Sequence, residues 1–139
     1  MNSAQKTGIG VFLVEDSVLI RSRLASSLGE LAGVRIAGET DTAKDAIEAI
    51  LRDRPDAVVL DLQLAAGSGI DVLRRVHAKA PEIVFIVLTQ NAGQQYRRAA
   101  LEAGARHFLD KSSDFDKVGP ILTEMQRSRN HHTYTLTKE

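Results

Sequence analysis

The fold is decided by a pattern that the chain first shows at Val11–Ser17 (VFLVEDS), where a short apolar run ends in carboxylates and a hydroxyl. Two further apolar runs are Ala57–Leu60 and Ile83–Leu88. None of the three runs alternates with polar residues, which is typical of parallel strands that helices cover on both faces. Weaker runs at Val34–Gly38 and Arg106–Leu109 predict two more strands, which makes five in all.

Apolar residues at helical spacing fill the gaps between these strands and the region after the last one. The stripes consist of Ile20, Leu24, Leu28 and Leu31; Ala43, Ala46, Ile47, Ile50 and Leu51; Ile70, Leu73 and Val76; Tyr96, Ala99, Ala100 and Ala103; and Val118, Ile121, Leu122 and Met125. Ser17 and Thr42 are suitable N-caps for the first two helices. Strand and helix alternate five times, which predicts an α/β fold with a parallel sheet and right-handed crossovers.

The composition is that of one domain without a strongly charged surface. The 139 residues contain 18 Lys plus Arg and 18 Asp plus Glu, and this zero net charge argues against a broad basic surface for nucleic acid. Cys is absent, which excludes disulfides, thiolate zinc sites and Cys nucleophiles. Because no apolar run approaches the roughly 20 residues of a membrane helix and the start is polar, we expect a soluble cytoplasmic protein.

We divide the chain into an N-terminal extension over residues 1–8, one domain over residues 9–128, and a polar tail or linker start over residues 129–139. The last boundary reflects the apolar helical pattern, which stops at about Ser128. Too few residues follow for a DNA-binding or catalytic module, so we expect any output function to lie in another protein or in further sequence.

Polar side chains follow four of the predicted strands: Glu15 and Asp16, Asp61, Thr89 and Gln90, and Asp110 and Lys111. Ligands of an open parallel sheet bind beyond the carboxyl ends of the strands, so these residues are predicted to converge on one edge. Neighbouring carboxylates repel one another, and a hard cation such as Mg²⁺, which prefers oxygen ligands, relieves the repulsion. A carboxylate can also attack phosphorus, while a lysine and a hydroxyl stabilise phosphoryl oxygens. The pattern therefore favours phosphoryl transfer to an aspartate.

Each of these residues also has an ordinary explanation when it is taken alone. The pair Glu15 and Asp16 could cap a helix, and so could Asp61. Thr89 could cap the end of a strand, and Lys111 could be a solvated lysine on the surface. What is specific is their joint position at four strand ends, in this order.

Together these motifs resemble the receiver domain of two-component response regulators. The resemblance covers about residues 9–127 and rests on VFLVEDS at 11–17, VVLDLQL at 58–64 with Gly69, VLT at 87–89 and GARHFLDK at 104–111. It implies a flavodoxin-like (βα)5 fold with strand order 2-1-3-4-5 and helices on both faces of the sheet.

The resemblance implies that Asp61 accepts a phosphoryl group from a histidine kinase or a histidine phosphotransfer protein. It also implies that Glu15 and Asp16 hold Mg²⁺ (or Mn²⁺), directly or through water, together with Asp61 and the backbone carbonyl of Gln63. Such a domain is a phospho-acceptor and not an enzyme, apart from slow self-catalysed phosphorylation and dephosphorylation.

The resemblance implies a switch as well. Thr89 resembles the hydroxyl that moves toward the phosphoryl group, and Lys111 resembles the lysine that pairs with its oxygens. Phe108 stands where the family keeps a rotating aromatic residue, although the residues alone favour a core phenylalanine. Phosphorylation adds roughly −1.5 to −2 charges and biases an equilibrium between two states. In the family, the fourth helix, fifth strand and fifth helix read out that change.

The chain departs from the family pattern at several positions. Glu15 replaces the commoner aspartate, and Ala65 stands where proline is common. Gln90 follows the switch threonine in place of a small residue, so that Gln63 and Gln90 both become candidates for tuning dephosphorylation. Ser112 follows the lysine in place of proline. A cis peptide bond costs about 2.5–4 kcal/mol without proline, so we expect the loop to hold the lysine differently.

We expect a receiver that signals to a downstream protein or an output domain in trans, without direct contact with nucleic acid or membrane. The alternatives are the receiver part of a longer DNA-binding regulator, a phosphohydrolase with an aspartyl intermediate, and a pseudo-receiver that is not phosphorylated. Such hydrolases carry a second aspartate where this chain has Gln63, and a pseudo-receiver is disfavoured by Asp61, Thr89 and Lys111. The sequence leaves open whether phosphorylation drives homodimerisation.

Overall fold

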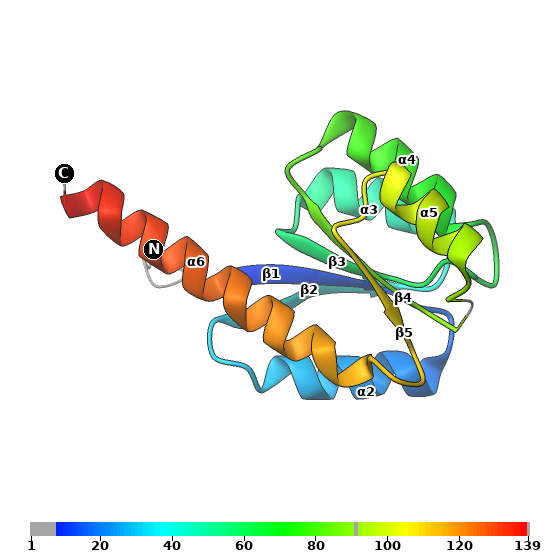
Figure 1. Cartoon of the computed structure of the whole chain (residues 1–139), viewed down its shortest axis with the longest axis horizontal. Helices are drawn as coiled ribbons and strands as arrows, with labels where there is room; N and C mark the ends of the chain where they lie inside the picture. Colours follow the sequence, from blue (N-terminus) through cyan, green and yellow to red (C-terminus); the bar gives the residue numbers. More distant parts are fainter. Residues whose placement is uncertain (1–7, 91, 139) are drawn as a thin grey trace.

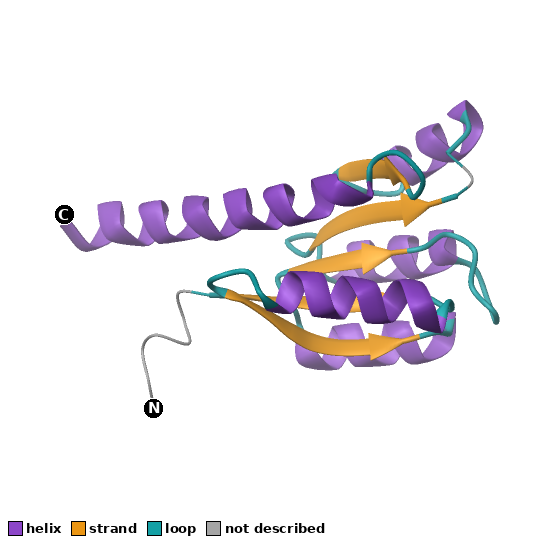
Figure 2. Ribbon diagram, turned by 90° about the horizontal axis from the view of Figure 1, so that it is seen from below, coloured by secondary structure: helices purple, strands orange, loops and turns teal. Residues whose placement is uncertain are grey.

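A computed structural model describes residues 8–90 and 92–138, with side chains for 8–90 and 92–129. Within these residues the chain forms a five-stranded parallel sheet in the order β2-β1-β3-β4-β5. The strands are β1 (Ile9–Val14), β2 (Val34–Thr40), β3 (Ala57–Leu60), β4 (Val84–Thr89) and β5 (His107–Asp110). Figure 2 shows the strand arrows pointing in one direction. The predicted fold class, strand number and strand order are therefore confirmed.

Helices cover both faces of this sheet. They are α2 (Val18–Gly29), α3 (Ala43–Asp53), α4 (Gly69–Lys79), α5 (Gln94–Glu102) and α6 (Val118–Lys138), with a short 3-10 helix η1 (Phe115–Lys117) before the last. Figure 1 shows α2 and α6 on one face of the sheet and α3, α4 and α5 on the other. This doubly covered arrangement explains why the central strands are continuously apolar.

Apolar side chains from alternate positions of each strand pack on opposite faces. On one face, Phe12 and Phe85 pack among residues of α3, α4 and α5, and both are buried. On the other face, Leu13 packs with Leu24 of α2 and Leu122 of α6, which are buried as well. Because β1 lies inside the sheet, its side chains contribute to the core on both faces.

Helix N-caps occur where the sequence predicts them. The Ser17 hydroxyl accepts a hydrogen bond from the Ile20 backbone N–H at 3.2 Å, and the Thr42 hydroxyl accepts one from the Asp45 N–H at 3.3 Å. Ser68 likewise caps α4. These caps satisfy backbone donors that would otherwise lack a partner, and they set where the chain leaves the strand ends and enters the helices.

The last helix differs from the sequence expectation. Its apolar pattern stops near Ser128, but the helix continues to Lys138. An apolar stripe reports which residues are buried, whereas a helix needs only its own backbone hydrogen bonds. No glycine or proline follows Pro120 to interrupt those bonds. Residues 129–138 therefore continue α6, and the division of the chain into a domain and a polar tail at residue 128 stays a prediction. The predicted N-terminal extension lies largely outside the described residues.

The α6 face gives a stability prediction. Leu122 is fully buried between α6 and the sheet, so Leu122→Ala removes packing and leaves a cavity. We expect it to lower the free energy of unfolding by about 2–5 kcal/mol in urea titrations. As a matched control, Leu101→Ala on α5 removes the same atoms from a side chain that is 40% exposed, and should cost less than about 1 kcal/mol. Equal losses in the two variants would contradict this assignment of the core.

Candidate functional site

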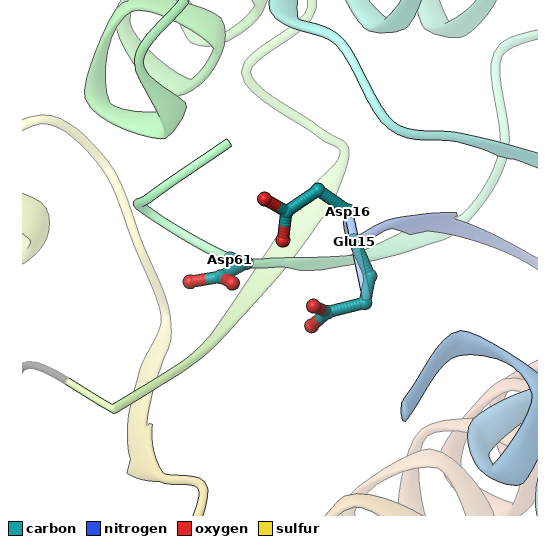
Figure 3. A group of neighbouring side chains, drawn as sticks. All are labelled: Glu15, Asp16 and Asp61. Atoms are coloured by element: carbon teal, nitrogen blue, oxygen red, sulfur yellow. The ribbon is translucent and has the colours of Figure 1, made fainter. Parts of the chain in front are cut away.

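Three carboxylates meet at the carboxyl edge of the sheet. Glu15 and Asp16 directly follow β1, and Asp61 directly follows β3, which is the neighbouring strand. One oxygen from each lies within 4.8 Å of the others. Figure 3 shows the side chains gathered at this edge. Glu15 and Asp61 are buried, and Asp16 is the more accessible of the three. The predicted convergence of these residues is what the parallel register of β1 and β3 produces.

The ammonium of Lys111 sits between the two buried carboxylates. Its Nζ lies 2.9 Å from Glu15 Oε1 and 2.9 Å from Asp61 Oδ2. The three side chains are at most 10% exposed, so this is an internal ion pair and not a surface contact. A buried carboxylate without a cation would be strongly destabilising. Lys111 thus neutralises part of the charge that the acidic residues bring to the edge.

Burial and the ion pairs shift the pKa values of this group in a consistent way. Burial raises the pKa of Glu15, and the hydrogen bond from Lys111 offsets this only in part. Burial alone would lower the pKa of Lys111, but hydrogen bonds to Asp61 and Glu15 together outweigh it, so that the pKa lies above its ordinary value. Lys111 is therefore a permanent cation in the cleft at neutral pH.

Backbone contacts hold the carboxylates in place. The Ser17 N–H donates to Glu15 Oε2 at 3.0 Å, and the Gln63 N–H donates to Asp61 Oδ1 at 3.1 Å. The Arg21 guanidinium donates to the Glu15 backbone carbonyl and pairs with Glu39 at 3.3 Å. Sequence analysis did not identify Arg21, because its role depends on the turn between β1 and α2 and carries no motif.

Thr89 and Phe108 are buried on β4 and β5, near the loop that carries Lys111. Thr89 is fully buried and lies opposite Asp110 in the strand register. The Lys111 N–H donates to the Thr89 carbonyl at 3.0 Å, which ties the lysine loop to the end of β4. Phe108 is packed in the core beneath α5, with the Arg97 guanidinium 5.9 Å from its ring centre. The core position that the residues alone favour for Phe108 agrees with its burial.

A solvent-facing cleft leads to Asp61. It is lined by Asp16, Ser17, Ile20, Asp61, Gln63, Gln90 and Lys111. Gln63 and Gln90 are exposed and lie just beyond the ends of the neighbouring strands β3 and β4. The structure thus brings both glutamines to the cleft mouth, as their positions after the strands suggested.

The residue after the lysine does not require an unusual peptide bond. No cis peptide bond occurs in the part of the chain that the structure describes, and this part includes Ser112. Lys111 nevertheless reaches both buried carboxylates. The loop that follows it is held by hydrogen bonds of Asp110 and Asp114, which sequence analysis did not foresee.

The donor set suits a small divalent cation. The converging atoms of Glu15, Asp16 and Asp61 are all carboxylate oxygens, which Mg²⁺ and Mn²⁺ prefer over nitrogen or sulfur ligands. Oxygens on opposite sides of one Mg²⁺ lie roughly 4 Å apart, since each bond is about 2.1 Å. The spacing within 4.8 Å is compatible with that geometry after small side-chain adjustments.

Comparison with known proteins identifies the family. Residues 11–122 match the family model described as the response regulator receiver domain. The chain belongs to this family. The matched residues include most of β1, all of β2 to β5 and α2 to α5, and the start of α6. Among the described residues of this receiver domain, no helix has the length and apolar character needed to cross a membrane.

Individual relatives are similar over most of the chain. The chain is 33% identical to protein-glutamate methylesterase/protein-glutamine glutaminase 1 of Carboxydothermus hydrogenoformans, and the match covers 82% of this chain and 34% of that protein. It is 30% identical to the sensory transduction protein LytT of Bacillus cereus, over 90% of this chain and 50% of that protein. The receiver therefore spans about a third to a half of these curated relatives.

A solved receiver domain is also similar. It belongs to the sensor histidine kinase PA1611 of Pseudomonas aeruginosa, and its structure is described as having a magnesium ion coordinated in the active-site cleft. It is 26% identical, with a TM-score of 0.73, and the match covers 86% of this chain and 98% of that chain.

Gly69 gives a test of how tightly the loop that follows Asp61 is packed. A Cβ at this position would lie 2.3 Å from the Asp61 backbone oxygen and 2.6 Å from Leu62 Cα. We therefore expect Gly69→Ala to lower the free energy of unfolding by about 1–3 kcal/mol, measured in urea. Gly29→Ala is the control, since nothing lies within 4 Å of its added Cβ, and it should leave stability unchanged or raise it by up to about 1 kcal/mol. A Gly69→Ala variant as stable as the control would show that the backbone near Asp61 and Leu62 can shift to accommodate the methyl group, and would contradict the prediction.

Proposed function

We propose that Asp61 accepts a phosphoryl group from a histidine kinase or a histidine phosphotransfer protein, and that the receiver signals by the resulting change of shape. The observation that carries this proposal is a buried aspartate at an open cleft, 2.9 Å from a lysine ammonium and beside two further carboxylates. An aspartate that serves only as a helix cap needs neither a buried cation nor a pair of further acidic residues beside it.

In the proposed reaction, an oxygen of Asp61 forms a bond to phosphorus while the bond from phosphorus to the donor histidine nitrogen breaks. The departing electron pair goes to that nitrogen. Lys111 is positioned to pair with the oxygens of the transferred group, since its Nζ is already 2.9 Å from Asp61 Oδ2. Phosphoryl transfer needs little covalent help and depends on positioning and charge neutralisation, which this group of residues supplies.

The residues proposed to hold Mg²⁺ (or Mn²⁺) are Glu15, Asp16 and Asp61, together with the backbone carbonyl of Gln63. When bound, the ion supplies positive charge to the phosphoryl oxygens. The converging carboxylate oxygens support this assignment, and so does the magnesium ion described for the PA1611 receiver. Glu15 already pairs with Lys111, which favours contact between Glu15 and the ion through water.

The proposed switch residues are Thr89, Lys111 and Phe108. After phosphorylation, Thr89 and Lys111 would both turn toward the new phosphoryl oxygens, and this requires their loops to shift. Because β5 joins the site to α5 and α6, we propose that the surface of α5, β5 and α6 reads out the change. The exposed polar side chains of α5 and the position of Arg97 over the Phe108 ring support a surface that can rearrange.

Gln63 and Gln90 are proposed to tune dephosphorylation. Both are exposed and line the cleft through which water reaches Asp61. Each amide can donate and accept hydrogen bonds, so each can orient the attacking water or shield the phosphoryl group from it.

We propose that the receiver unit comprises residues 9–128 and acts in the cytoplasm, where histidine kinases present their phosphoryl groups. The output is a downstream protein, an output domain in trans, or further sequence of a longer DNA-binding regulator. The share of its curated relatives that the chain spans supports further sequence, although the names of these two relatives do not say that it binds DNA. Gln63, which stands where aspartyl phosphohydrolases carry a second aspartate, argues against an enzyme of that class.

Phosphorylation of Asp61 is tested with a small acyl phosphate and Mg²⁺. We expect the intact mass of the wild-type protein to rise by one phosphoryl group, because Asp61 is accessible through the cleft. The Asp61→Asn variant should show no such increase. An adduct that forms equally in both proteins would contradict the assignment of the acceptor. Rapid turnover of unrelated phosphate esters would instead indicate a hydrolase.

Metal binding is tested by thermal and urea unfolding in the presence of Mg²⁺. A ligand that binds only the folded state stabilises it by about 2.7 kcal/mol at 100 times its dissociation constant. We expect the wild type to follow this dependence and Asp16→Asn to need a higher Mg²⁺ concentration, because Asp16 supplies one of the oxygens. Asp53→Asn, on the far end of α3, should respond like the wild type. No stabilisation of the wild type by Mg²⁺ or Mn²⁺ would overturn the proposed metal site.

A further inference from the structure

We infer that Asp110, Ser112 and Asp114 form a carboxylate clasp that positions Lys111 for phosphoryl transfer. These are positioning residues, since they act through Lys111. The inference rests on the proposed function and adds to it the means by which this chain holds its lysine without a proline at position 112.

The clasp consists of hydrogen bonds on both sides of Lys111. Asp110 Oδ1 accepts from the Ser112 backbone N–H at 2.8 Å and from the Ser112 hydroxyl at 2.6 Å. Asp114 Oδ2 accepts from the Asp110 N–H at 3.0 Å, and the Asp114 N–H donates to the Asp110 carbonyl at 2.7 Å. Asp110 and Asp114 are therefore bonded to each other in both directions, and Lys111 lies in the loop that they close.

Three of the four hydrogen bonds of the clasp have a carboxylate as the acceptor, and charged acceptors make stronger hydrogen bonds than neutral ones. Hydrogen bonds from Ser112 hold the pKa of Asp110 below its ordinary value. The backbone hydrogen bond from Asp110 and the side-chain bond from Lys117 do the same for Asp114. Both residues are therefore carboxylates at neutral pH, and the clasp is complete under the conditions in which the domain would work.

The Lys111 side chain keeps its position only if the backbone on both sides of the residue is held in place. Its side chain has a flexible four-carbon stem, yet its Nζ lies 2.9 Å from both Glu15 and Asp61. The Lys111 N–H is bonded to Thr89 on one side, but no proline ring restricts the backbone on the other. An aspartate that bonds the N–H two residues later forms a turn of its own, and this turn fixes the backbone that follows the lysine.

The clasp also connects the lysine to the last helix. Lys117 pairs with Asp114 at 3.1 Å, and the Lys117 N–H donates to the Asp114 carbonyl at 2.8 Å. Lys117 ends η1, directly before α6 begins at Val118. The position of the lysine is thus set by the same short segment that starts α6.

The test compares Asp110→Ala with Asp53→Ala, another aspartate that accepts a hydrogen bond from a neighbouring side chain but lies outside the site. With saturating acyl phosphate and Mg²⁺, we expect Asp110→Ala to be phosphorylated roughly 10- to 100-fold more slowly than the wild type, since small misplacements of a reacting group have effects of this size. Asp53→Ala should react at the wild-type rate. Mg²⁺ should stabilise Asp110→Ala at least as well as the wild type, because its carboxylate ligands are intact and Lys111 competes less for them.

A double-mutant cycle separates positioning from general damage. In a Lys111→Ala background, Asp110→Ala should slow phosphorylation no further. An Asp110→Ala variant that reacts like the wild type would overturn the inference, as would a second full loss in the Lys111→Ala background. If Asp110→Ala fails to fold in urea titrations, Ser112→Ala and Asp114→Asn take its place in the same cycle.

A second readout does not need phosphorylation. In the resting wild-type protein, the ammonium protons of Lys111, observed through the attached ¹⁵N, should be protected from exchange with water, because two buried carboxylates hold the ammonium. That protection should be lost in Asp110→Ala and kept in Asp53→Ala. Unchanged protection in Asp110→Ala would contradict the clasp. A wild-type protein that takes up no phosphoryl group would instead contradict the proposed function, and the two failures are therefore distinguishable.

Discussion

The ammonium of Lys111 lies between the buried carboxylates of Glu15 and Asp61, and the arrangement of the site depends on this ion pair. Two carboxylates at the ends of adjacent central strands repel each other and lose hydration, so burying them without a cation would be strongly unfavourable. The cation, Lys111, directly follows β5, which is the edge strand and is separated from β3 by β4. The parallel sheet in the order β2-β1-β3-β4-β5 places the carboxyl ends of β1, β3 and β5 along one edge, so that these three side chains can meet.

The same interaction is central to the proposed response to phosphorylation. In the resting protein, Lys111 shares its hydrogen bonds between Glu15 and Asp61, and the pKa of Glu15 stays above its ordinary value because the pair only partly offsets its burial. In the proposed reaction, a phosphoryl group on Asp61 brings new charge into this balance, and Lys111 would follow it. Thr89 and Phe108 are both buried, and in this proposal they would connect that movement with α5 and α6 through β4 and β5.

Much of this could be predicted from particular residues. The apolar runs specify the strands, because a strand covered on both faces has no polar alternation, and β3 begins and ends where its run does. The caps at Ser17 and Thr42 follow from local hydrogen bonding. The end of α6 could not be predicted from the apolar stripe, because burial and helix length are separate properties. Arg21 was missed because its bond to Glu15 forms only when the turn closes.

The sequence by itself determined which chemical groups are present and in what order along the chain. It placed an acid after β1, an acid after β3, a hydroxyl at the end of β4 and a lysine after β5, and the strand-end rule for parallel sheets made their convergence predictable. Only the tertiary structure decided that Lys111 bridges Glu15 and Asp61, and that Asp110 and Asp114 hold its loop. Those contacts join strands from different parts of the chain or depend on the path of one turn, and no local pattern of residue types encodes such distances.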